Sequence, residues 1–133
     1  MLKPCRGTPF ELSESTPLVE RIKTSPGGID HCFALNSPGE IGRLAALLVH
    51  NSSGRTLEVY TTQPGIQVYT GNSLDGSYVG HNQTVYQKHS AICLEAQHYP
   101  DSPNQPDFPS TLLSAGEVYQ LSLIHIFQPT RPY

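Results

Sequence analysis

Residues 55–71 read RTLEVYTTQPGIQVYTG and contain two runs in which apolar and polar side chains alternate. An alternation with a period of two is typical of β-strands that bury one face. The Pro64-Gly65 pair between the runs is a turn signal, because proline presets its φ angle and glycine tolerates positive φ. The stretch therefore predicts two consecutive strands. Their expected buried-face residues are Leu57, Val59, Thr61, Ile66, Val68 and Thr70.

Similar short runs lie on both sides of this stretch. The residues Asn51-Ser52-Ser53-Gly54 separate two of them and indicate a hairpin turn. Proline and glycine, 12 and 11 residues of the 133, cluster between the runs and favour many turns. The sequence thus predicts an all-β fold with antiparallel pairing. The expected strands are residues 30–35, 43–50, 55–62, 65–71, 90–97 and 117–127.

Three other segments interrupt this β pattern. Thr16-Pro17 predicts the start of a short amphipathic helix, with Thr16 as the N-cap and Pro17 in the first helical position. The helix is expected to end by Pro26. Residues 72–89 and 98–115 show no regular period, and loops of that length tend to carry function.

Composition argues against several classes of protein. A net charge of −3 with scattered lysines and arginines predicts no nucleic-acid partner. No apolar run approaches the roughly 20 residues that cross a bilayer, so we expect no membrane partner. The amino terminus lacks the apolar centre of a secretory signal, and the three cysteines have no metal-ligand spacing. We therefore expect a cytoplasmic protein without a metal site.

Polar side chains in two of the expected strands suggest a site. Gln67 opposes the apolar face of residues 65–71, and Glu95 opposes that of residues 90–97. A carboxylate and an amide on such faces build a polar cleft, so we predict that both point to one side of a sheet, with Asp30 near them. Taken singly, each of these residues is more often a solvated strand or cap residue.

In combination, three blocks of sequence resemble the aldose 1-epimerase family, the galactose mutarotases. They are GIDHCFAL at 28–35, RTLEVYTTQPGIQVYTGN at 55–72 and KHSAICLEAQHYPDSPNQPDFPS at 88–110. The resemblance runs from about Gly7 to about Tyr119, is strongest to the animal-type enzymes, and points to the carboxyl-terminal part of the family domain. It implies an antiparallel β-sandwich, the mutarotase-like supersandwich, of which residues 1–120 would be an incomplete fragment.

The resemblance also implies an isomerase that interconverts the α and β anomers of hexoses such as galactose and glucose in carbohydrate metabolism. Glu95 falls on the family's catalytic base, and Asp30 and Gln67 fall on positions that hold sugar hydroxyls. Lys88-His89 matches a family motif to which we assign no chemical role. The implied partner is a monosaccharide, and the reaction requires no cofactor. Oligomeric state has no sequence signal.

The chain departs from the family pattern in two places. Family enzymes are at least about twice as long, and their acid histidine and other sugar contacts lie in the amino-terminal half, so this chain is expected to be a truncated form that is inactive alone. Residues 121–133, LSLIHIFQPTRPY, resemble a translated transposase sequencing adapter and are expected to be a non-native tail. The alternative function is a non-catalytic carbohydrate-binding or sugar-sensing module.

Overall fold

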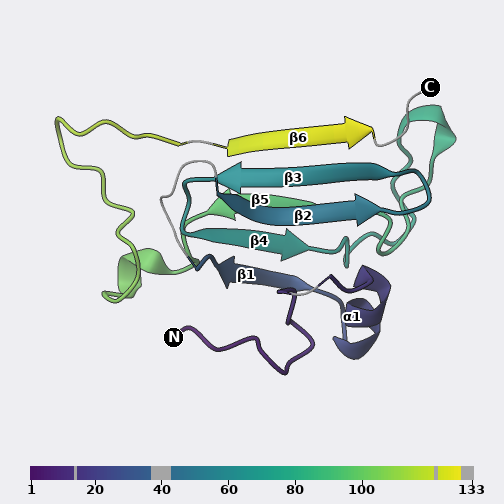
Figure 1. Cartoon of the computed structure of the whole chain (residues 1–133), viewed down its shortest axis with the longest axis horizontal. Helices are drawn as coiled ribbons and strands as arrows, with labels where there is room; N and C mark the ends of the chain where they lie inside the picture. The colour runs from purple at the N-terminus through teal and green to yellow at the C-terminus, as the bar shows by residue number, and fades with distance from the viewer. Residues whose placement is uncertain (14, 37–42, 122, 130–133) are drawn as a thin grey trace. The chain divides into compact units, whose positions relative to one another are not determined.

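A computed structural model describes residues 1–13, 15–36, 43–121 and 123–129, the last seven by their backbone (Figure 1). Antiparallel strands dominate it, which confirms the all-β prediction. The elements are α1 (Leu18–Thr24), β1 (Asp30–Ala34), β2 (Leu44–His50), β3 (Arg55–Thr61), β4 (Gly65–Tyr69), β5 (Cys93–Gln97) and β6 (Leu123–Pro129), with single 3₁₀ turns at His81–Gln83 and Ser102–Asn104.

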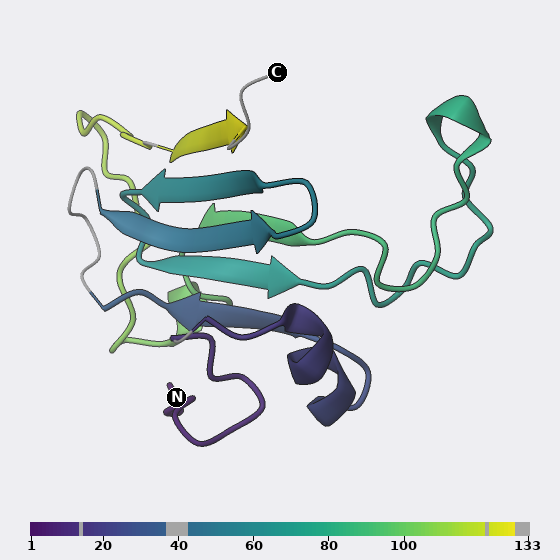
Figure 2. The same cartoon turned by 45° about the vertical axis from the view of Figure 1, so that its right-hand side comes forward.

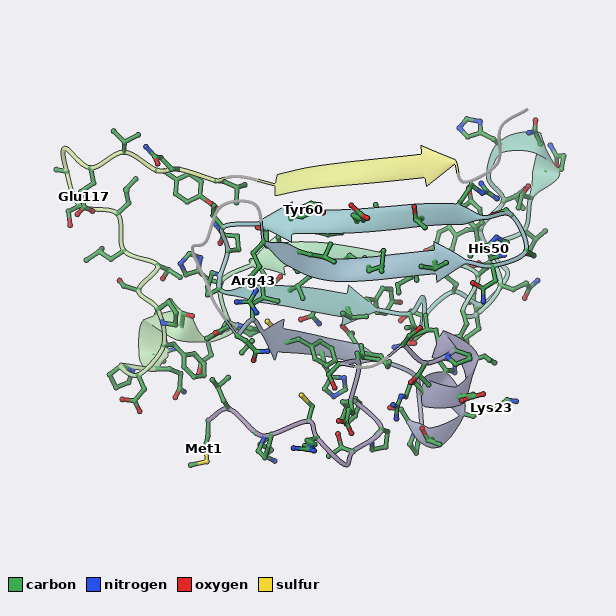
Figure 3. All side chains as sticks on the ribbon, viewed as in Figure 1. Met1, Lys23, Arg43, His50, Tyr60 and Glu117 are labelled. Carbon is green, nitrogen blue, oxygen red and sulfur yellow. The ribbon has the colours of Figure 1, made fainter. Side chains whose placement is uncertain are left out.

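The strands form two three-stranded sheets, with the orders β1-β4-β5 and β2-β3-β6. In the second sheet β2 and β3 make an antiparallel hairpin, and β6 lies antiparallel along the other side of β3 (Figure 1). The hairpin turns at residues 51–54 as expected, and His50 stands at the turn end of β2 (Figure 3). Consecutive strands joined by short turns pair in this way because little chain entropy is lost in bringing them together.

By its internal contacts the chain divides into two compact units. One comprises Met1–His31 with Gln67–Cys93, and the other comprises Cys32–Ile66 with Leu94–Tyr133. Ile29 and Val68 are buried in the first, and Val59 and Ile66 in the second. The alternation predicted for β4 is confirmed, because Ile66 and Val68 are buried while Gln67 and Tyr69 are half-buried.

Several sequence-based boundaries were wrong, three of them in ways that matter for the fold. Pro17 occupies the N-cap of α1, and the Thr16 hydroxyl instead accepts a hydrogen bond of 3.2 Å from Arg21. The strand expected at 90–97 begins only at Cys93, because the backbone turns at His89, where φ is +64°. The strand expected at 117–127 corresponds to β6, which begins only at Leu123 and ends at Pro129. Glu117 belongs to a turn instead, because Gly116 has a φ of +90° and the Glu117 amide donates to the Ser114 carbonyl.

The two long irregular stretches carry local structure. Residues 72–92 leave β4 and fold back on themselves through a Val79–Val85 bridge (Figure 2). In residues 98–115 the Asp101 carboxylate accepts hydrogen bonds from the side chains of Asn104, at 2.6 Å, and Gln105, at 2.8 Å. Both stretches therefore have defined turns in place of sheet pairing.

Candidate functional site

Asp30 and Gln67 come together in the first compact unit. Asp30 begins β1 and its side chain is exposed, whereas Gln67 is half-buried in the middle of β4, the neighbouring strand. The Gln67 Nε2 donates a hydrogen bond of 2.7 Å to Asp30 Oδ1. The second oxygen of the Asp30 carboxylate is left to accept from a ligand, because an ionised carboxylate has capacity for about four hydrogen bonds.

The other end of the Gln67 amide is unusual. Its Oε1 is buried and has no hydrogen-bond partner within the described part of the chain. Buried side-chain oxygens in proteins normally have a partner, so an orphan of this kind points to a missing donor.

Glu95 is exposed in the middle of β5, between two half-buried neighbours, Leu94 and Ala96. This is the expected alternation, with the carboxylate on the less buried face of its strand. β5 is hydrogen-bonded to β4, the strand that carries Gln67. In this described strand Glu95 is therefore not buried in an apolar core, which would have argued against a chemical role.

Cys32 and Tyr99 both lie close to Gly65 in the second compact unit. A Cβ at Gly65 would lie 3.0 Å from Cys32 Sγ and 3.0 Å from the Tyr99 ring, which is closer than ordinary van der Waals contact, so a larger residue there would force these side chains to shift. Burial raises the pKa of the Cys32 thiol, and a hydrogen bond with Gln97 partly opposes that rise. Burial also raises the pKa of Tyr99. With raised pKa values, the Cys32 thiol and the Tyr99 phenol are both neutral at physiological pH.

Other site classes find little support. No group of three or more His, Cys, Asp or Glu side chains is arranged to hold a metal ion in the described ranges. No helix found among the described residues is long and apolar enough to span a membrane. A pocket in the second unit is lined in part by Arg43, the residue before β2, which is labelled in Figure 3. None of the three predicted site residues lines it.

Sequence reasoning missed the residues that support Asp30. Thr70 and Asn72 hydrogen-bond to the backbone of Ile29, the residue before Asp30, and His89 hydrogen-bonds to the carbonyl of Thr70. Thr70 was expected only as a member of the buried face. The one available signal was that Asn72 and His89 belong to the two blocks that carry the family resemblance.

Comparison with known proteins places the chain in a family. The family described as aldose 1-epimerase matches residues 1–125. Mouse galactose mutarotase is 48% identical over 120 residues, which are 90% of this chain and 35% of that protein. Human galactose mutarotase is 49% identical over 117 residues, 87% of this chain and 34% of the relative.

A bacterial relative extends the similarity. The aldose 1-epimerase of Escherichia coli strain K12 is 33% identical over 125 residues, 89% of this chain and 36% of its own length. The chain therefore spans about a third of the length of the curated relatives it matches. With nearly all of its residues matched by the family, this chain belongs to the aldose 1-epimerase family.

Proposed function

We propose that this chain carries part of the active site of an aldose 1-epimerase, with Glu95 as the catalytic base and with Asp30 and Gln67 as the residues that hold the sugar. The observation that carries the proposal is the hydrogen bond of 2.7 Å between Gln67 and Asp30. It joins two polar side chains from neighbouring strands in a protein of this family.

The pair suits the recognition of a hexose. Asp30 is exposed and keeps an acceptor oxygen beyond the one that Gln67 occupies. Gln67 fixes that carboxylate through its own hydrogen bond. A fixed acceptor selects for sugar hydroxyls in one configuration, because a sugar that misplaces its hydroxyl leaves a polar group unpaired.

Glu95 suits the role of base. Mutarotation begins when a base takes the proton from the anomeric hydroxyl while an acid protonates the ring oxygen. The ring opens to the aldehyde, the C1–C2 bond rotates, and closure on the other face gives the second anomer. No redox change occurs and no group is transferred, so we expect the reaction to need no cofactor.

The substrates we propose are galactose and glucose. The animal relatives are galactose mutarotases, and the bacterial relative is an aldose 1-epimerase. We further propose that the 133 residues alone turn over these sugars slowly or not at all. Supporting this, the relatives named above are almost three times as long, and the resemblance implies an acid histidine that lies outside the matched stretch.

Polarimetry of fresh α-D-galactose tests the proposal. The complete gene product should speed the approach to the equilibrium rotation above the uncatalysed rate, and α-D-glucose should respond as well. A protein that binds galactose by calorimetry yet leaves the rate unchanged would be a sugar-binding module, and the enzyme proposal would fail. Absence of both binding and rate would remove the sugar site altogether.

A further inference from the structure

A hydrogen-bonded network holds the backbone immediately before Asp30. The Ile29 amide donates to Thr70 Oγ1 at 2.9 Å. The Ile29 carbonyl accepts from the Thr70 amide at 3.0 Å and from Asn72 Nδ2 at 2.9 Å. Both backbone polar groups of Ile29 are therefore fixed by residues that follow β4.

The centre of the network is buried. Ile29 is 0% exposed and Thr70 is 1% exposed, so water does not compete for the bonds between these two residues. Thr70 Oγ1 accepts from the Ile29 amide, and its single proton faces two acceptors, Asn72 Oδ1 at 2.7 Å and the Ile29 carbonyl oxygen at 3.2 Å. A valine at position 70 would have nearly the same shape but would leave the Ile29 amide and the Asn72 amide oxygen without this partner.

His89 fixes Thr70 from the other side. Its Nδ1 lies 2.8 Å from the Thr70 carbonyl oxygen, which can only accept, so Nδ1 carries the proton. The backbone of His89 has a φ of +64°, a conformation that non-glycine residues adopt rarely. Surrounding contacts must hold such a residue in place, and functional sites are where strained residues of this kind gather.

We propose that Thr70 is a positioning residue for sugar binding and that His89 supports it. By fixing Ile29, they hold the Asp30 carboxylate where it accepts from Gln67 and keeps its other oxygen turned to the ligand. This inference rests on the proposed function. It assigns a role to the conformation of Ile29 and to one residue of the Lys88-His89 motif.

The test is a kinetic split in the complete gene product. Thr70→Val should raise KM for α-D-galactose about tenfold, the effect of losing one buried hydrogen bond, and should change kcat less than about twofold. Thr70→Ser keeps the hydroxyl and should restore KM. The matched control is Thr61→Val, because buried Thr61 likewise accepts from a backbone amide, that of Gln63, at 3.1 Å.

A merely structural role predicts a different pattern. In that case both valine variants would lower the unfolding temperature and neither would move KM, which would overturn the proposal. If the wild-type protein did not speed the mutarotation of galactose, the proposed function would be refuted, and the positioning role would fall with it. The two failures are told apart by the wild-type rate alone.

A second pair of variants applies if Thr70→Val does not fold. Asparagine and glycine both tolerate the φ of +64° at position 89, but only asparagine offers an amide donor close to the place of Nδ1. His89→Asn should keep KM within about twofold, and His89→Gly should raise it several-fold. Equal KM values for these two variants would contradict the role of the hydrogen bond to Thr70.

Discussion

Gln67 and Asp30 lie 37 residues apart in the chain and are joined by a side-chain hydrogen bond of 2.7 Å. Asp30→Asn keeps the shape of the side chain and removes its charge. We expect it to weaken galactose binding by about ten- to a hundredfold, because hydrogen bonds to charged groups contribute about 1.5–3 kcal/mol. Calorimetric titration of the complete gene product measures the change.

Asp75→Asn is the control for this charge change. The Asp75 carboxylate is exposed in the same compact unit and accepts a local hydrogen bond of 2.9 Å from the Ser77 amide. It should leave galactose affinity unaltered. Equal losses in both variants would mean that net charge, and not the Asp30 site, governs binding.

Gly28 and Gly27 make a matched pair for stability. Both have positive φ, +86° and +91°. A Cβ at Gly28 would overlap Asn72 Oδ1 and lie 2.9 Å from His89 Cε1, whereas a Cβ at Gly27 would meet no atom within 4 Å. Each alanine variant should lose about 1–2 kcal/mol to the backbone conformation, and Gly28→Ala about 1–3 kcal/mol more to overpacking. Urea unfolding monitored by circular dichroism gives both values, and similar losses would contradict the packing around Gly28.

Cys32 should be the slowest thiol of the chain to react. It is half-buried with a raised pKa, whereas Cys5 and Cys93 are exposed. Because the thiolate is the reactive form, alkylation of Cys32 at pH 8 should be about tenfold slower or more. Mass spectrometry of iodoacetamide-treated protein resolves the three sites. Faster modification of Cys32 than of Cys93 would show that its burial is wrong.

The same thiol predicts a pH dependence of stability. The folded-state pKa of Cys32 is above its ordinary value of 9.0, so above that pH the unfolded chain loses this proton first. The contribution of Cys32 to the free energy of unfolding is constant below pH 9.0 and falls as pH rises through the folded-state pKa. Cys32→Ser should flatten this alkaline decline, and an unchanged slope would rule it out.

The alternation of side chains was sufficient to predict β4 and its buried face. Ile66 and Val68 are buried and Gln67 is not, as the two-residue period requires. Long-range pairing could not be read in the same way. The turn residues 51–54 predicted the pairing of β2 with β3, but the sequence has no signal for the pairing of β3 with β6, because that partner is chosen by sheet packing and not by local propensity.

The sequence predicted only those site residues whose side-chain type suggests a chemical role. Asp30, Gln67 and Glu95 have side chains whose chemistry suggests a role, and their catalytic and sugar-binding roles remain predictions. Thr70 and His89 act through the backbone of other residues, so their importance depends on φ values and hydrogen bonds that residue identity does not encode. The assignment of residues 121–133 as a non-native tail also remains a prediction.

The 133 residues expressed alone should self-associate. β2 is an edge strand, and Leu47 and Val49 on it are 55% and 49% exposed. Exposed apolar edges favour pairing with other chains. Leu47→Lys should reduce association in light scattering, whereas Val19→Lys, at a residue that is 56% exposed on α1, should not. A monomer with a sharp, cooperative thermal transition would contradict this expectation.

The most direct test of the account is the mutarotation rate of Glu95→Gln in the complete gene product, measured by polarimetry of α-D-galactose. Glu58→Gln is the control, because Glu58 is also a strand glutamate but lies in β3, in the other sheet. Its carboxylate accepts a hydrogen bond of 2.9 Å from Tyr60 of the same strand, which is labelled in Figure 3. We predict that Glu95→Gln lowers kcat by about a hundred- to ten-thousandfold, the usual effect of losing a general base, while Glu58→Gln stays near wild type. An unchanged rate in Glu95→Gln would contradict the assignment of Glu95 as the base.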